Sequence, residues 1–293
     1  MTFNPDSDIS GGKASHRGRN TGLAIGGGGI GVVAIFLLSQ FLGVDLSGLL
    51  GGGGGQPAAD DTALEQCLTG QDANERIECR MQGASASLED YWQAEGPNIG
   101  VDYVGPQNFI LFEQSVSTAC GNASSATGPF YCPPDQTIYI DTSFYDQLES
   151  RFGASGGPLA EMYVVAHEWG HHVQNIAGVL ERAQDGQTGP TSNAVRVELQ
   201  ADCFAGSWAA AASQTEDEQG VPFLQPITRD EYTQAIDAAA AVGDDSIQEA
   251  TQGQVNPHTF THGTSEQRVR WFEAGYEQGA GACDTFSIDG SQL

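Results

Sequence analysis

The segment His167-Glu-Trp-Gly-His171 combines residue types and a spacing that suit hydrolysis at a metal ion. Histidines four residues apart project from one face of an α-helix, and both imidazoles can bind the same zinc ion. Glu168 then lies beside the ion, where it can accept a proton from a zinc-bound water. The pattern also occurs by chance on buried helices, so the surrounding elements must support this interpretation.

A third metal ligand has to come from elsewhere in the chain, because catalytic zinc usually has three protein ligands and one open position. Glu198 is the best candidate, since it lies in an alanine-rich segment without proline that follows Ser192, a suitable helix cap. Asp202 shares its helical face and can accept the second N–H of a zinc-bound histidine. The spacing also permits the reverse assignment, with Asp202 as the ligand and Glu198 as its support. A solvated carboxylate pair is the remaining alternative.

The elements that position these residues predict an α+β fold with a small sheet and a mostly helical body. The metal-binding helix is expected to begin at Pro158 and to end before Gly178, with apolar residues every three or four positions between them. Short segments rich in β-branched and aromatic residues predict strands at 99–104, 108–112 and 137–141. The last of these comes shortly before the metal-binding helix. It is expected either to border the substrate cleft or to be an ordinary core strand.

Further helices follow from capping signals and composition. Residues 62–95 predict two or three short helices, and Thr228-Arg-Asp-Glu231 is a capping box that opens a helix towards Val242. Two more helices are expected to begin at Asp244 and at Ser265.

Several longer strings resemble those of one bacterial family, the neutral zinc metallopeptidases of the glutamate-type zincins. They are Gly128–Pro133, Val164–Gln174, Glu198–Cys203, Thr261–Arg268 and Cys283–Phe286. The resemblance runs from about residue 60 to the C-terminus. It implies a zincin-like fold, a single zinc ion and hydrolysis of peptide bonds in peptide or protein substrates. Trp169 departs from the family pattern, which leads us to expect an aliphatic residue there; the change affects packing and not the ligands.

A group that stabilises negative charge on the substrate carbonyl oxygen is expected opposite the zinc ion. The resemblance favours His262, in Thr261-His-Gly263, for this role. A structural or solvated loop histidine is the alternative, and Arg268 could serve instead. His172 directly follows the second ligand and points to another face of the helix, so we do not expect it to bind the metal.

The N-terminal region carries a signal for membrane insertion. Residues 23–44 contain no charge and are long enough to cross a bilayer core of about 30 Å, and Lys13, Arg17 and Arg19 precede them. We therefore expect a cytoplasmic tail at 1–22, a transmembrane anchor at 23–44, a glycine-rich linker at 45–61 and an extracytoplasmic peptidase domain at 62–293. A cleaved signal peptide is the alternative for the apolar segment.

Charge and cysteine content restrict the partners and the environment. A net charge of −27 argues against nucleic acid as a partner, so the expected partners are a peptide substrate and, through the anchor, the lipid bilayer. Six cysteines after the apolar segment suit an oxidising exterior. Their spacing favours Cys67–Cys79 and Cys120–Cys132, which leaves Cys203 with Cys283. A second metal site and free buried thiols are the alternatives.

Together these features predict a membrane-anchored peptidase that depends on one zinc ion. His167, His171 and Glu198 would bind the ion, Glu168 would be the general base, Asp202 would orient an imidazole and His262 would be the electrophile. The alternative function is a binding or scaffold protein of the cell envelope in which zinc has only a structural role. A secreted peptidase, released from its anchor, differs from the first prediction only in processing.

Overall fold

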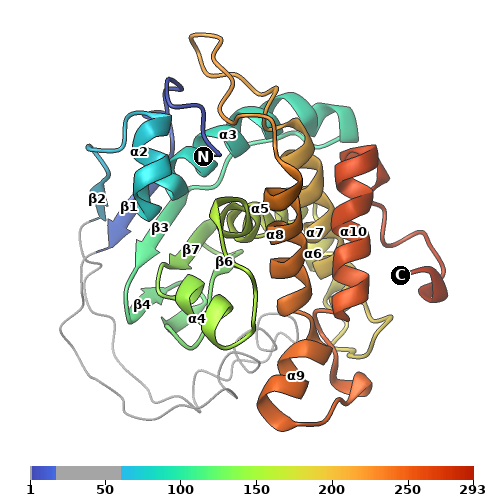
Figure 1. The fold of residues 1–293 in the computed structure, drawn as a ribbon. Coiled ribbons are helices and arrows are strands. Elements are labelled where there is room, and N and C mark those ends of the chain that lie inside the picture. Colours follow the sequence, from blue (N-terminus) through green and yellow to red (C-terminus); the bar gives the residue numbers. More distant parts are fainter. Residues whose placement is uncertain (1, 18–60) are drawn as a thin grey trace.

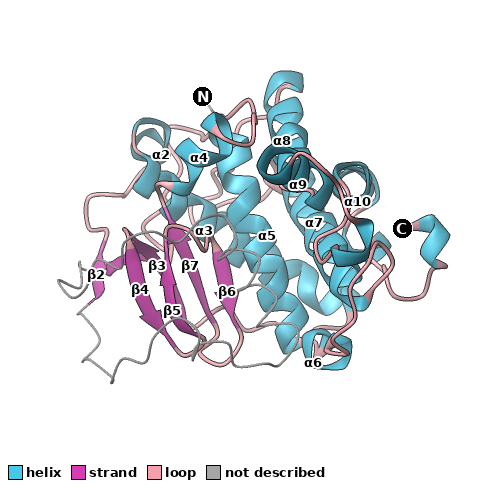
Figure 2. Ribbon diagram, turned by 90° about the horizontal axis from the view of Figure 1, so that it is seen from below, coloured by secondary structure: helices cyan, strands magenta, loops and turns pink. Residues whose placement is uncertain are grey.

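The computed structural model describes residues 2–17 and 61–293, which form a small sheet packed against a helical body. Figure 2 shows the strands gathered on one side of the molecule and the helices on the other. The predicted α+β class is confirmed. The described helices are α2 (Gly70–Glu75), α3 (Ile77–Glu95), α4 (Phe144–Ser150), α5 (Pro158–Ile176), α6 (Val179–Ala183), α7 (Asn193–Ala211), α8 (Arg229–Ala241), α9 (Asp244–Gln252) and α10 (Ser265–Gln278).

The main sheet has the strand order β2-β1-β3-β7-β6. Its strands are β1 (Ala14–Arg17), β2 (Asp61–Ala63), β3 (Asn108–Phe112), β6 (Phe130–Cys132) and β7 (Thr137–Asp141). Strands β1, β3 and β7 are parallel, while β2 and β6 run antiparallel to their neighbours. A separate hairpin is formed by β4 (Ser115–Thr118) and β5 (Gly121–Ser124).

Both faces of the sheet are buried at β3 and β7, which fits the continuous apolar run at residues 109–112 of β3. Phe109 and Ile138 are paired in register and belong to the main core, which lies between the sheet and the helices. Ile110 and Tyr139, the next pair, belong to a second core with Val116 and Ala123 of the β4–β5 hairpin. Successive side chains of a strand point to opposite faces, so β3 and β7 each contribute to both cores.

The helices that carry the site begin and end at the signals expected from the sequence. Pro158 is the first residue of α5, and Gly178, with a left-handed φ of 69°, follows its end. The Ser192 side chain accepts a hydrogen bond from the backbone N–H of Val195 and caps α7. Thr228 and Glu231 form the expected capping box of α8. In Figure 1, α5, α7, α8 and α10 lie together as the helical body.

The prediction of a strand at 99–104 is wrong. Residues Gly96–Ile99 form a short 3₁₀ helix that ends at Gly100, which has a φ of 78°. The following segment has no regular structure, and the carbonyl of Val104 contacts His172 at 2.6 Å instead of a neighbouring strand.

The predicted arrangement across a membrane is also wrong. Within residues 2–17 and 61–293, no helix combines the length and the apolar character that a membrane crossing requires. The predicted anchor at 23–44 lies outside the described residues. Residues 2–17, which were expected on the cytoplasmic side, fold together with the domain that was expected on the other side. Phe3 and Ile9 are fully buried in the main core, and β1 pairs with β3.

All three predicted disulfides are present. Cys67–Cys79 and Cys120–Cys132 each close a short loop, while Cys203–Cys283 joins α7 to a segment 80 residues later. No described cysteine is free.

A glycine contact fixes the closest packing in the helical body, between α7 and α10. A Cβ atom on Gly275 would overlap the carbonyl oxygen of Cys203. We expect Gly275→Ala to lower the free energy of unfolding by about 1–3 kcal/mol, because the overlap outweighs alanine's better helix propensity. Urea unfolding measures the effect. Gly281→Ala is the matched control, since a Cβ there meets nothing within 4 Å. Equal stability of the two variants would contradict the prediction.

Candidate metal centre

Three side chains from α5 and α7 form the group that could hold a metal ion. The Nε2 atom of His167 lies 3.2 Å from Oε2 of Glu198, and Nε2 of His171 lies 3.5 Å from Oε1 of the same carboxylate. All three ligand atoms lie within 4.8 Å of one another. Two imidazole nitrogens and one carboxylate oxygen are the donor set of many zinc sites, so these residues fit a zinc ion.

The two helices approach closely at this point because Gly170 faces α7. A Cβ atom on Gly170 would lie only 3.0 Å from Cα of Ala201. Side chains of α5 and α7 near this contact are therefore close enough to touch one another. The glycine inside the histidine motif accordingly has a packing role, which brings Glu198 towards His167 and His171.

Asp202 lies on the other side of the His167 ring. Its Oδ1 atom is 2.8 Å from Nδ1 of His167, and its Oδ2 atom is 2.9 Å from Nε of Arg268. Tyr163 also donates its hydroxyl hydrogen to Asp202. Asp202 therefore contacts the ring nitrogen that faces away from Glu198.

Burial and charge act in opposite directions on these groups. Burial alone would raise the pKa of Asp202, but the cations Arg268 and His167 hold it below its usual value. Burial also acts to raise the pKa of Glu198, yet His171 and His262 hold it well below its usual range. The pKa of His167 is raised to about 9, because Asp202 outweighs the effect of burial, whereas burial lowers that of His171 to about 4.

Glu168 is buried but lies outside the group of three ligand atoms. Burial raises its pKa to about 7, with the neighbouring His167 acting in the opposite direction. The backbone N–H of Tyr131, in β6, donates a hydrogen bond to its carboxylate. A carboxyl group that titrates near neutrality beside three candidate ligands can both accept and donate a proton.

The strand that borders this carboxylate is β6 and not β7. Strand β7 pairs with β3 on one side and β6 on the other, so it has no free edge. The hypothesis that Thr137–Asp141 borders the cleft is therefore wrong, and the core-strand alternative is correct. Strand β6 has only three residues and no clear alternation, so it could not be predicted from its sequence pattern.

His262 lies near Glu198 and is held by an acid that no sequence motif indicated. Its Nδ1 atom is 3.1 Å from Oδ1 of Asp244, while Oδ2 of Asp244 accepts the backbone N–H groups of residues 261–263. Burial lowers the pKa of His262, but Asp244 and Glu198 raise it above its usual value. The only sequence signal for Asp244 was its place at the start of a helix.

The other candidate side chains have structural partners. His172 points to another face of α5, as expected, where its Nδ1 atom lies 3.1 Å from the hydroxyl of Tyr131. Arg268 is paired with Asp202, and its Nη1 atom lies 4.0 Å from Oε2 of Glu198. His258 lies exposed in the short 3₁₀ helix Pro257–Thr259.

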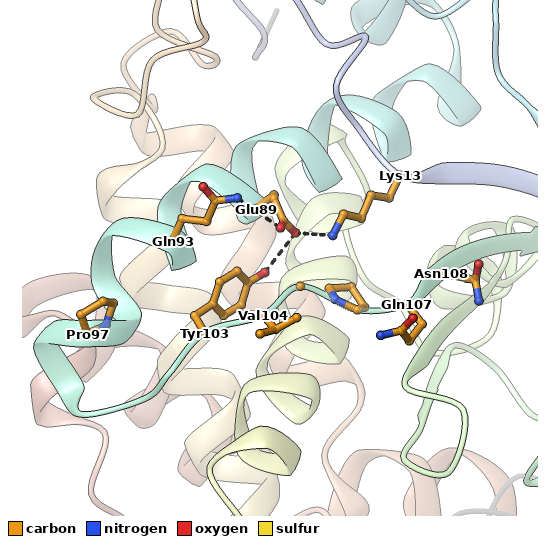
Figure 3. Close-up of a pocket in the computed structure, with 10 residues that line it drawn as sticks. Lys13, Glu89, Gln93, Pro97, Tyr103, Val104, Gln107 and Asn108 are labelled. Atoms are coloured by element: carbon orange, nitrogen blue, oxygen red, sulfur yellow. Dashed lines mark hydrogen bonds and ion pairs between the residues drawn. The ribbon is translucent and has the colours of Figure 1, made fainter.

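A separate cavity of about 860 Å³ is lined by residues of α3, by the segment 103–108 and by Lys13, and does not include the three candidate ligands. Figure 3 shows Glu89 between Lys13 and Tyr103 in its wall. The Tyr103 hydroxyl accepts a hydrogen bond from Nε1 of Trp169. An aliphatic residue in place of Trp169 could not make this hydrogen bond.

Comparison with known proteins places this site in context. A Mycobacterium tuberculosis protein, Rv2575, is 49% identical over 85% of both chains, and YpfJ of Escherichia coli K12 is 38% identical over 96% of this chain and 94% of its own; both are described as uncharacterized. No solved structure matches the chain significantly. A family match covers residues 5–286, so it includes the N-terminal segment that packs into the fold. The chain belongs to the family described as "Putative neutral zinc metallopeptidase".

Proposed function

We propose that the protein is a peptidase that uses one zinc ion, with His167, His171 and Glu198 as ligands. The observation that carries the proposal is the position of Glu168. It is buried beside the three ligand atoms without being one of them, and its pKa is raised to about 7. A structural zinc site usually has four protein ligands and no use for an additional acid. This position therefore favours a peptidase over the scaffold protein.

The geometry supports Glu198 as the third ligand and Asp202 as the carboxylate that orients His167. Glu198 faces Nε2 of both histidines, whereas Asp202 faces Nδ1 of His167. A zinc-binding histidine commonly donates its second N–H to a carboxylate, which fixes the tautomer. Asp202 is in the right place to do so, which argues against the reverse assignment.

A bound zinc ion would lower the pKa of a coordinated water towards 7 and polarise the substrate carbonyl. Glu168 accepts a proton from the attacking water and passes it to the leaving amine. His262, held by Asp244, donates a hydrogen bond to the carbonyl oxygen as negative charge develops there. Strand β6, the last strand of the main sheet among the described residues, borders the substrate next to Glu168.

The first test separates proton transfer from metal binding. We expect Glu168→Gln to retain one zinc ion per chain while turnover falls by roughly 10²–10⁴-fold, because the amide cannot accept the proton. Glu198→Ala should lose the ion. The full chain with intact disulfides is loaded with zinc and incubated with a proteome-derived peptide library, and zinc content is measured by elemental analysis. Glu181→Gln, on the exposed surface of α6, is the control.

Cleavage by a Glu168→Gln enzyme at the parental rate would contradict the general-base assignment. If neither the parent nor the variant cleaves any peptide while zinc remains bound, the scaffold function is favoured instead. A zinc-loaded Glu198→Ala protein would favour Asp202 as the ligand.

The second test concerns His262. We expect His262→Ala to lower kcat by roughly 10²–10³-fold with little change in zinc content, because a donor to the developing oxyanion is lost. Asp244→Asn should have a smaller effect in the same direction, since the imidazole remains but loses its charged partner. Steady-state kinetics on a peptide found in the library gives kcat and KM separately. His258→Ala, an exposed loop histidine, should behave as the parent, and parental kcat in His262→Ala would rule out this role.

A further inference from the structure

A chain of side-chain amides leads from a backbone carbonyl near the C-terminus to the metal-facing histidine His171. The Nε2 atom of Gln200 donates to the carbonyl of Cys283 at 2.8 Å. The Oε1 atom of Gln200 accepts from Nε2 of Gln174 at 3.1 Å, and Gln174 also donates to the carbonyl of Val197 at 2.7 Å. The Oε1 atom of Gln174 lies 2.8 Å from Nδ1 of His171. The chain joins α5, α7 and the C-terminal segment.

The direction of this chain follows from its two ends. A backbone carbonyl can only accept a hydrogen bond, so the amide nitrogen of Gln200 must face Cys283, and its oxygen then faces Gln174. The carbonyl of Val197 accepts a hydrogen bond from Nε2 of Gln174, so it independently requires the amide nitrogen of Gln174 to point away from His171. The oxygen of Gln174 therefore faces His171, and Nδ1 of His171 must carry the hydrogen. Its Nε2 atom, which faces Glu198, is left with the free electron pair that a metal ion requires.

Burial makes this orientation stable. Gln174 is fully buried and Gln200 is 9% exposed. Turning either amide would place two oxygen atoms against each other in a site without bulk water, and an unmade hydrogen bond in such a place is costly. The two histidines are thus supported differently. His167 contacts the charged Asp202, whereas His171 contacts a neutral amide whose orientation is set by hydrogen bonds to backbone carbonyls.

The disulfide Cys203–Cys283 holds the far end of the chain in place. Cys203 lies on α7, the helix that also carries Gln200 and Glu198. The carbonyl of Cys283 is therefore fixed relative to the helix that supplies the third ligand. Reduction of this bond would leave the carbonyl free to move away from Gln200.

We propose that Gln174 and Gln200 are positioning residues that set the tautomer of His171, and that the Cys203–Cys283 disulfide supports metal affinity through them. The proposal rests on the proposed metal site but not on peptide cleavage. Its readouts are therefore the histidine tautomer and the zinc dissociation constant, which are both measured without a substrate.

The parent protein provides the first test, without any substitution. Two-dimensional ¹⁵N–¹H NMR of the metal-free full chain, labelled at histidine nitrogens, reports which ring nitrogen of His171 carries the hydrogen. We expect the Nδ1–H form for the neutral ring. The Nε2–H form as the main species would overturn the proposal.

Substitutions provide the second test. We expect Gln174→Leu to raise the zinc dissociation constant roughly 10–100-fold, as is usual for partners of metal ligands, and to give a mixture of tautomers. Gln200→Leu should have a smaller effect, because Val197 still orients Gln174. The matched control is Gln82→Leu, which removes another buried amide, 5% exposed, that bonds to Gly12 and Ala14 instead. Chelator competition measures the constants, and parental affinity in a folded Gln174→Leu protein would disprove the relay.

Removal of the disulfide tests its link to the relay. The double substitution Cys203→Ala, Cys283→Ala should weaken zinc binding several-fold, whereas Cys67→Ala, Cys79→Ala should leave it unchanged. Equal effects of the two pairs would overturn the coupling. If zinc affinity falls as expected but no peptide is cleaved by the parent, the relay stands and the peptidase proposal fails.

Discussion

The ion pair between Arg268 and Asp202 is the interaction on which the site depends most. Its Nε and Oδ2 atoms lie 2.9 Å apart, and both side chains are almost completely buried. Buried carboxylates without a cation would take up protons, and a protonated Asp202 would no longer hold His167 by charge. Because Arg268 comes from α10, the site requires α5, α7 and α10 to pack together. The three candidate ligands alone would need only the first two helices.

The local part of this arrangement could be predicted from the sequence. Spacing of four residues placed His167 with His171 and Glu198 with Asp202, and caps such as Ser192 fixed the helix boundaries, since these signals act within one or two turns. The nonlocal part could not be predicted. Asp244 reaches His262 because a loop wraps around its carboxylate, and neither residue carries a signal for the other. The three-residue strand β6 could not be predicted either, because its position depends on pairing with β7.

The N-terminal segment shows how a strong local signal can mislead. Basic residues before an uncharged stretch predicted a cytoplasmic tail, but residues 14–17 form a strand of the same sheet that supports the site. Strand pairing depends on partners far along the chain, here Phe109 to Leu111, so the pattern of charges could not reveal it. The family match from residue 5 onwards agrees with this placement, whereas the resemblance based on motifs began only near residue 60.

Strand β6 connects the sheet to the chemistry of α5 at three points. The backbone N–H of Tyr131 reaches Glu168, and the hydroxyl of Tyr131 contacts His172 and Asn175 one and two turns further along the helix. The disulfide Cys120–Cys132 also ties β6 to the β4–β5 hairpin. A strand held this firmly cannot shift along α5. Because Tyr131 is fixed along α5, its N–H stays within reach of Glu168, so the position of the buried carboxylate depends on the sheet as well as on the helix that carries it.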